Sequence, residues 1–160
     1  MTWAPGAADV NSGPNQTLIA AAVAQATAAD VVVLAVGTEL STAGEGHDAE
    51  SLEFSAGQQQ LISAVLAAAK APVVVVTLTA VPLDISTLMA DSRVGAIVHA
   101  GQPAVNTLGV GDVLFGGVSP AGRTGTSVPR PHSSPTLLAR IIVLEVVHEQ
   151  RTKCISFRRV

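Results

Sequence analysis

Aromatic side chains, cysteine and charge are all scarce in this sequence of 160 residues. With one Trp, three Phe and no Tyr, it lacks the aromatic surface on which nucleic-acid bases stack. The lone cysteine, Cys154, cannot form an internal disulfide or a cysteine-based metal site. The net charge is −3 and the only basic cluster begins at Arg151, so the sequence does not predict a basic surface that would bind nucleic-acid phosphates. We therefore expect no nucleic-acid partner and no metal site.

Long hydrophobic runs are also missing. No stretch approaches the ~20 apolar residues that a membrane helix needs, so we expect no membrane span. The first residues, MTWAPGAADVNSG, lack the basic and apolar regions of a secretory signal. We expect no signal peptide in this chain, and the sequence leaves its compartment open.

Alanine and valine make up most of the apolar content, in short runs that alternate between strand and helix patterns. Buried strands are uniformly apolar when both faces of a parallel sheet are covered, and helices repeat their apolar positions every three to four residues. Short right-handed connections then favour a doubly wound sheet. The fold class is therefore α/β, a three-layer α/β/α sandwich with a mostly parallel sheet. The expected strands are 31–36, 73–78 and 94–98, and the expected helices are 17–29, 58–70, 85–90 and 104–115.

The two ends of the chain fit this alternation less well. Residues 1–14 are rich in Gly, Pro and Asn and predict an irregular segment or a short edge strand around 8–10. Residues 116–130 read as a linker. Within 129–160, the spacing of the apolar residues in 137–147 does not distinguish a helix from a strand. We expect an unrelated tail there, disordered or a lone helix or strand, with no role in the sheet.

Polar residues follow the end of each expected strand. The first strand ends at Gly37 and leads into a loop with Glu39, Glu45 and Asp48. The other two lead into 79–84 and 99–106. Because ligands of open α/β sheets bind at the carboxyl ends of the strands, this rim is the expected site.

Several of these residues have a plainer interpretation beside the functional one. Glu45 could be a solvated loop acid, although Gly44 and Gly46 would let its backbone approach a ligand. His99 fits a residue near substrate and a satisfied residue at the core edge about equally well. An N-cap explains Asp84 more simply than a sugar contact does.

The motifs typical of nucleotide and cofactor sites are incomplete in this sequence. Gly44-Glu45-Gly46 lacks the third glycine of a dinucleotide fingerprint, and no phosphate loop is present. His47 has no ligand spacing around it, so a chance loop histidine is the better interpretation. We expect no cofactor.

Several spaced motifs begin at the end of the first expected strand. In GTELSTAGEGHDAESLEFSAGQQQLISAV, Gly37 is followed by Glu45 eight residues later and by Asp48 three further on, then by Leu52, Phe54 and Gln58. PLDI, IVHAGQP, DVLFG and SPAGR come later in the chain. In spacing and order these motifs resemble the carboxyl-terminal α/β sandwich domain of family 3 glycoside hydrolases, with Leu52 and Phe54 in the family's Leu-x-Leu places and Gln58 in its Gln-containing helix. The resemblance covers 3–128 as an incomplete domain and leaves out 129–160.

The resemblance implies β-glucosidase or β-xylosidase chemistry at a site shared between two domains. Glu45 stands in the place of the general acid/base, and a barrel domain without a counterpart in this chain supplies the nucleophile. Retaining hydrolysis needs two carboxyl groups ~5–5.5 Å apart, so we expect the chain alone to be inactive. Asp48 and His99 are the candidate substrate contacts, and family members are often secreted.

Two other functions stay open. One is a non-catalytic carbohydrate-binding or interaction module of the same fold. The other is a generic nucleotide-binding α/β domain.

Overall fold

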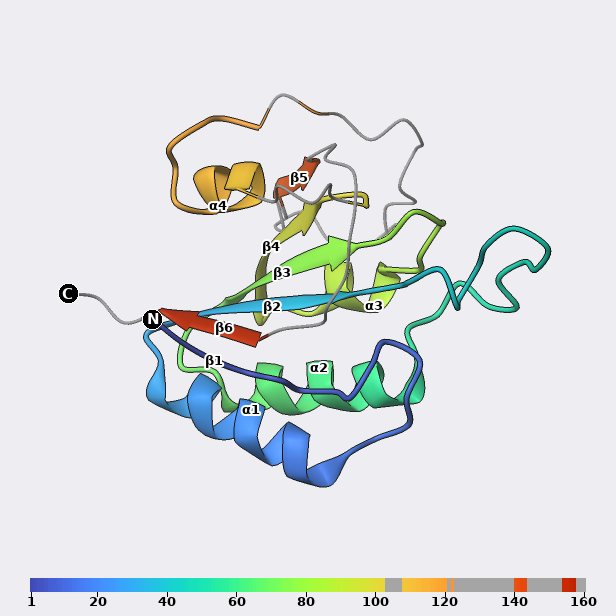
Figure 1. Ribbon diagram of the computed structural model, residues 1–160. Helices are drawn as coiled ribbons and strands as arrows, with labels where there is room; N and C mark the ends of the chain where they lie inside the picture. The colour runs from blue at the N-terminus through green and yellow to red at the C-terminus, as the bar shows by residue number, and fades with distance from the viewer. Residues whose placement is uncertain (103–107, 121, 123–139, 144–153, 158–160) are drawn as a thin grey trace.

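The computed structural model describes residues 1–102, 108–120, 122, 140–143 and 154–157 (Figure 1). Strands and helices alternate along most of this length. The strands are β1 (Thr2–Ala4), β2 (Val31–Gly37), β3 (Val73–Leu78), β4 (Val94–His99), β5 (Arg140–Val143) and β6 (Cys154–Phe157). The helices are α1 (Gln16–Ala28), α2 (Ala56–Ala68), α3 (Ser86–Ala90) and α4 (Leu108–Leu114).

The six strands form a single open sheet in the order β1-β6-β2-β3-β4-β5. β2 pairs with β3, β3 with β4 and β4 with β5, all parallel, whereas β6 is antiparallel to both of its neighbours. The expected α/β fold with a mostly parallel sheet is thus confirmed. The carboxyl ends of β2, β3 and β4 consequently lie along one edge.

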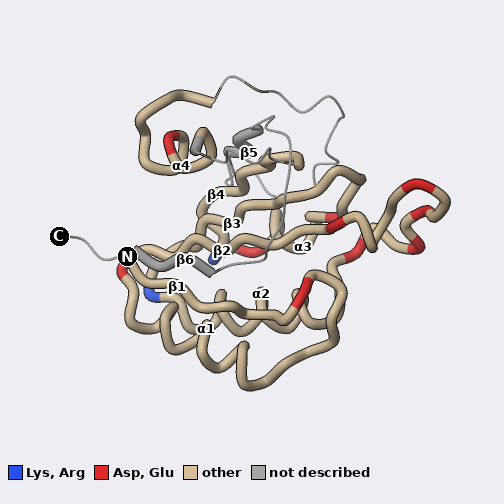
Figure 2. Tube along the Cα trace, in the orientation of Figure 1, with Lys and Arg blue, Asp and Glu red and all other residues tan. Residues whose placement is uncertain are grey.

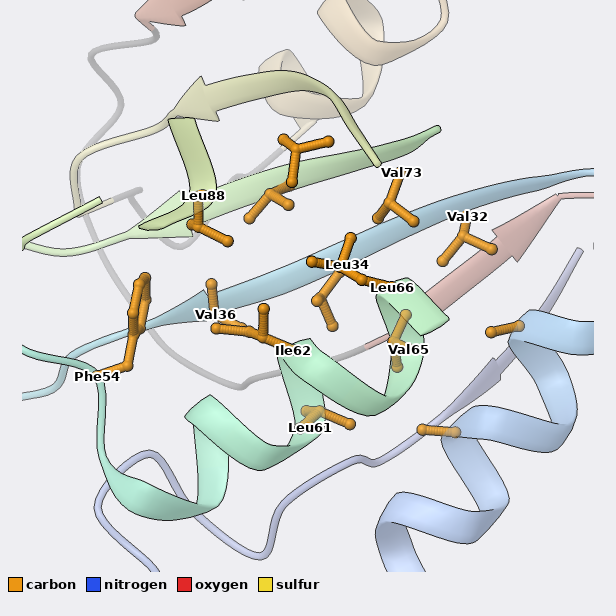
Figure 3. Close-up of a cluster of buried hydrophobic side chains, with 14 of the residues drawn as sticks. Val32, Leu34, Val36, Phe54, Leu61, Ile62, Val65, Leu66, Val73 and Leu88 are labelled. Atoms are coloured by element: carbon orange, nitrogen blue, oxygen red, sulfur yellow. The ribbon is translucent and has the colours of Figure 1, made fainter. Parts of the chain in front are cut away.

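Helices cover both faces of the sheet. Successive β2 side chains point to opposite sides, so each face has apolar side chains to bury. Val32, Leu34 and Val36 pack into one core with residues of α1, α2 and α3 (Figure 3). Val33 and Ala35 pack on the other side, where α4 lies. This doubly covered strand explains the uniformly apolar run.

Side-chain caps fix the beginnings of the two long helices. The Asn15 side chain accepts a hydrogen bond from the backbone of Leu18 at 3.2 Å, and Ser55 accepts one from Gln58 at 3.4 Å. Such caps satisfy backbone donors that have no partner within the helix. Asn15 is thus the N-cap of α1. The cap at Ser55 begins α2 two residues earlier than the sequence pattern suggested.

The chain ends differ from expectation. The amino-terminal edge strand is β1, and residues 8–10 form bends instead of a strand. The expected absence of 129–160 from the sheet is wrong for β5 and β6, which pair with β4 and β2. The exposed edges of a sheet present unpaired backbone groups, and these short strands satisfy them. The division of the chain at residue 128 stays a prediction, as does the part of the 104–115 helix that lies outside the described residues.

Candidate functional site

The ends of the three central strands are joined into one rim by backbone hydrogen bonds. Thr38 donates its N–H to the carbonyl of Leu78 at 2.9 Å, and Thr79 donates to Gly101 at 2.8 Å. These bonds continue the ladders past the last strand residues. The turns that follow β2, β3 and β4 therefore begin side by side, as the sequence predicted.

A hydroxyl contact and a tight glycine position hold β2 against β3 at this rim. The side-chain oxygens of Thr38 and Thr79 lie 2.6 Å apart. A β-carbon at Gly37 would collide with the backbone carbonyl of Leu78, which cannot turn aside as a flexible side chain could. The glycine that ends the apolar run is therefore required by the close approach of a neighbouring strand.

Gln58 of α2 fixes the start of the acid loop, which we define as residues 38–54. Its side-chain oxygen accepts the N–H of Gly37 at 2.8 Å, while its amide nitrogen donates to the carbonyls of Gly37 at 2.8 Å and Val10 at 2.7 Å. The side chain is only 2% exposed. The sequence placed Gln58 in the family register but gave it no role, because its partners are 21 and 48 residues away.

Glu45 lies exposed near the tip of the acid loop. Gly44 and His47 exchange two backbone hydrogen bonds, of 3.1 and 3.2 Å, around Glu45 and Gly46. Gly46 has a φ of 87°, a conformation that favours glycine. The loop projects well beyond the sheet and helices, and acidic residues gather on it (Figure 2). The flanking glycines thus make a tight turn that carries Glu45 away from the body of the domain.

The far end of the acid loop is also anchored. Asp84 donates its backbone N–H to the carbonyl of Leu52 at 2.7 Å, which ties the loop to the turn after β3. Phe54 is 6% exposed and packs into the core beside α2 (Figure 3). Asp48 lies exposed between the two anchors. The loop is therefore held at its base and at its return, with Glu45 and Asp48 exposed between the two anchors.

His99 ends β4 and lies half-buried on the rim. Its Nδ1 lies 3.0 Å from the hydroxyl oxygen of Thr77, a fully buried residue of β3. Burial lowers the pKa of His99, because removing water disfavours the charged imidazolium. His99 is thus a hydrogen-bonded residue at the core edge that stands on the rim, and its contact with a substrate stays a prediction.

We expect the lowered pKa of His99 to make the protein less stable in mild acid. The unfolded chain binds a proton on His99 near pH 6.5, while the folded chain binds it only at lower pH. The contribution of neutral His99 to the free energy of unfolding is thus fully present above about pH 6.5. It is lost as the pH drops toward the pKa of His99 in the folded state. We expect His99→Asn to reduce the loss of Tm between pH 7.5 and 5, measured by thermal unfolding. Substituting the exposed His47 by Asn is the control, and an equal reduction there would contradict the assignment.

Asp84 has a local role in addition to its backbone contact with the acid loop. Its carboxylate accepts the N–H of Ser86 at 2.8 Å, at the first residue of α3, although the cap position itself is Ile85. Hydrogen bonds from the Ser86 side chain and backbone lower the pKa of Asp84. Asp84 thus organises the turn that receives the returning acid loop.

A groove of about 320 Å³ lies between α2 and α3, away from the tip of the acid loop. Phe54, Ile62, Leu66 and Leu88 form its apolar side, and the ion pair between Arg93 and Asp91 also lines it.

Within the described ranges, no cluster of three His, Cys, Asp or Glu side chains could hold a metal ion. Nor does any helix in that part of the chain have the length and apolar character to cross a membrane.

Comparison with known proteins identifies the relatives of this chain. Residues 5–152 match the Glycosyl hydrolase family 3 C-terminal domain. Beta-D-xylosidase 3 of Arabidopsis thaliana is 38% identical over 105 residues, covering 65% of this chain and 14% of the relative. Probable beta-D-xylosidase 6 of the same plant is 34% identical over 79% of this chain and 16% of its own length. A beta-glucosidase of Rhizobium radiobacter is 38% identical over 70% of this chain and 13% of its own.

Proposed function

Because this chain belongs to the glycosyl hydrolase family 3 C-terminal domain family, we propose that it supplies the general acid/base of a retaining glycosidase site. Glu45 is the proton donor, and a separate barrel domain provides the nucleophile. The observation that carries the proposal is the placement of Glu45. It is exposed on a projecting loop whose two ends are anchored at the rim of the sheet.

The geometry of the loop suits a site between two domains. Retaining hydrolysis requires a second carboxyl group ~5–5.5 Å from the acid, with the glycosidic bond between them. A projecting, anchored loop can enter a cleft formed against another domain without disturbing its own fold. Closure of that cleft would remove water from around Glu45, the setting in which a carboxylic acid keeps its proton until it donates it.

Asp48 and His99 are proposed as substrate contacts of the same site. Asp48 shares the exposed loop with Glu45, and a carboxylate can accept hydrogen bonds from sugar hydroxyls. His99 stands on the rim from which the loop begins, with one ring nitrogen already used by Thr77. The other ring nitrogen is the one that we propose contacts the sugar.

The proposed substrates are terminal β-linked xylose and glucose. Relatives of this chain are named beta-xylosidases and beta-glucosidase. The chain spans between 13% and 16% of the length of these curated relatives, so the remainder of the site belongs to segments outside it.

The test is reconstitution. The full chain is mixed with the separately produced barrel domain of a family relative, and hydrolysis of nitrophenyl β-xyloside and β-glucoside is followed. Turnover that requires both components is the expected result. No turnover with barrels from several relatives would overturn the proposal. If calorimetry then detects binding of xylose or glucose oligomers to the chain alone, the non-catalytic carbohydrate-binding module becomes the better description.

A further inference from the structure

We propose that Asn11 is a positioning residue that fixes the direction of the acid loop and thereby the place of Glu45. This inference rests on the proposed function for its catalytic consequence. The contact itself is a property of the described chain. Asn11 lies in the amino-terminal segment before α1, some thirty residues from the loop in sequence.

Both polar groups of the Asn11 side chain form hydrogen bonds with the acid loop. Its amide nitrogen donates to the hydroxyl of Ser41 at 2.8 Å, and its oxygen accepts the hydroxyl proton of Thr42 at 2.9 Å. No single-function side chain could make this pair of contacts. Asn11 is exposed, so burial in the core does not require an amide at this position.

Local hydrogen bonds hold the backbone around Asn11. Its backbone N–H donates to the Asp9 carboxylate at 2.9 Å, and the hydroxyl of Ser12 donates to the Asp9 carbonyl at 3.0 Å, which closes a turn around it. The preceding residue, Val10, is 6% exposed and its carbonyl accepts the Gln58 bond described above. The amino-terminal segment is thus tied to the same side chain that fixes the end of β2.

The contacted part of the loop is a closed turn directly before Glu45. Thr42 donates its N–H to the Glu39 carbonyl at 2.9 Å, and Ser41 donates its hydroxyl to the Glu39 carboxylate at 2.6 Å. Two residues separate Thr42 from Glu45, so their Cα atoms, three residue steps apart, lie at most about 11 Å from each other. A displacement of only ~1 Å in a reacting group can lower a rate 10²-fold, so an anchor this close to the acid bears on catalysis.

The first experiment measures the contact without any catalysis. Amide hydrogen exchange is followed by NMR in the full chain and in Asn11→Ala, Thr42→Val and Thr42→Ser. In the first two variants, we expect exchange to rise about fivefold or more at the amides of Thr42, Ala43 and Gly44, with β2 and α2 unchanged. Thr42→Ser keeps the hydroxyl and should behave as the parent. Gln16→Ala, which removes an exposed amide contact between α1 and α2, is the matched control.

The second experiment uses the reconstituted mixture. Asn11→Ala and Thr42→Val are expected to lower kcat about tenfold with a smaller change in KM, since the acid is misplaced while the sugar contacts outside the acid loop remain. Unchanged loop exchange, or an equal rise throughout β2 and α2, would overturn the positioning role. So would faster loop exchange with an unaltered kcat. If no barrel restores turnover, the proposed function fails, while the exchange data still decide whether Asn11 orders the loop.

Discussion

Replacing Glu45 by Gln is expected to lower kcat of the reconstituted mixture by roughly 10²- to 10⁴-fold, the range that a positioned general acid contributes. Gln keeps the size and exposure of the side chain but has no proton to give to the leaving oxygen. Because Glu45 is exposed and packs against no core cluster, the fold should be unaffected. The measurement is steady-state hydrolysis of the nitrophenyl glycosides, with the Tm of each variant determined alongside.

Glu50→Gln is the matched control for this prediction. Glu50 is an exposed glutamate on the same loop, so its substitution changes the charge equally but leaves the proposed donor in place. Leaving groups that depart without protonation should be less affected by Glu45→Gln than those that need it. Equal losses in the two variants would indicate that the charge of the loop matters, and not proton donation by Glu45.

The part of the fold that the sequence predicted is the part in which local pattern and burial agree. β2 is covered on both faces, so its apolar run was unambiguous, and β3 and β4 followed the same rule. Parallel pairing then determined where the strand ends meet. The rim beginning at Thr38, Thr79 and His99 was therefore predictable from the sequence alone.

The remaining features depend on contacts between distant residues. β5 and β6 are four residues each and pair with edges that are defined only once the rest of the sheet is folded. The brace from Asn11 to the acid loop joins positions about thirty residues apart, and both partners are ordinary polar loop residues. Periodicity carries no signal for such pairs, so the sequence suggested Glu45 as the candidate acid but not the contacts between Asn11 and the loop that carries it.

Gln58→Leu is expected to reduce the free energy of unfolding by about 3–5 kcal/mol. Leu has a similar volume, so packing in the core is largely kept while all three hydrogen bonds of the carboxamide are lost. Buried polar groups left without a partner cost about 1–3 kcal/mol each, and the N–H of Gly37 and the carbonyl of Val10 would both lose the partner that Gln58 provides. For a chain of this size, such a change lowers Tm by about 10 °C, measurable by thermal or urea unfolding.

Gln60→Leu is the control, because Gln60 is exposed on the same helix and, among the described residues, its side chain accepts one hydrogen bond, from Gln16. Its effect on the free energy of unfolding should stay within about 0.5 kcal/mol, as for most surface substitutions.

Gln58→Glu distinguishes hydrogen-bond acceptance by the Gln58 side chain from hydrogen-bond donation by it. A carboxylate can still accept from Gly37 but cannot donate to either carbonyl, and it places a charge where the site is closed to water. Gln58→Glu should therefore be at least as unstable as Gln58→Leu near neutral pH. Its stability should rise as the medium is acidified and the carboxyl regains a proton to donate. A Gln58→Leu protein as stable as Gln60→Leu would show that the acid loop is fixed by other means.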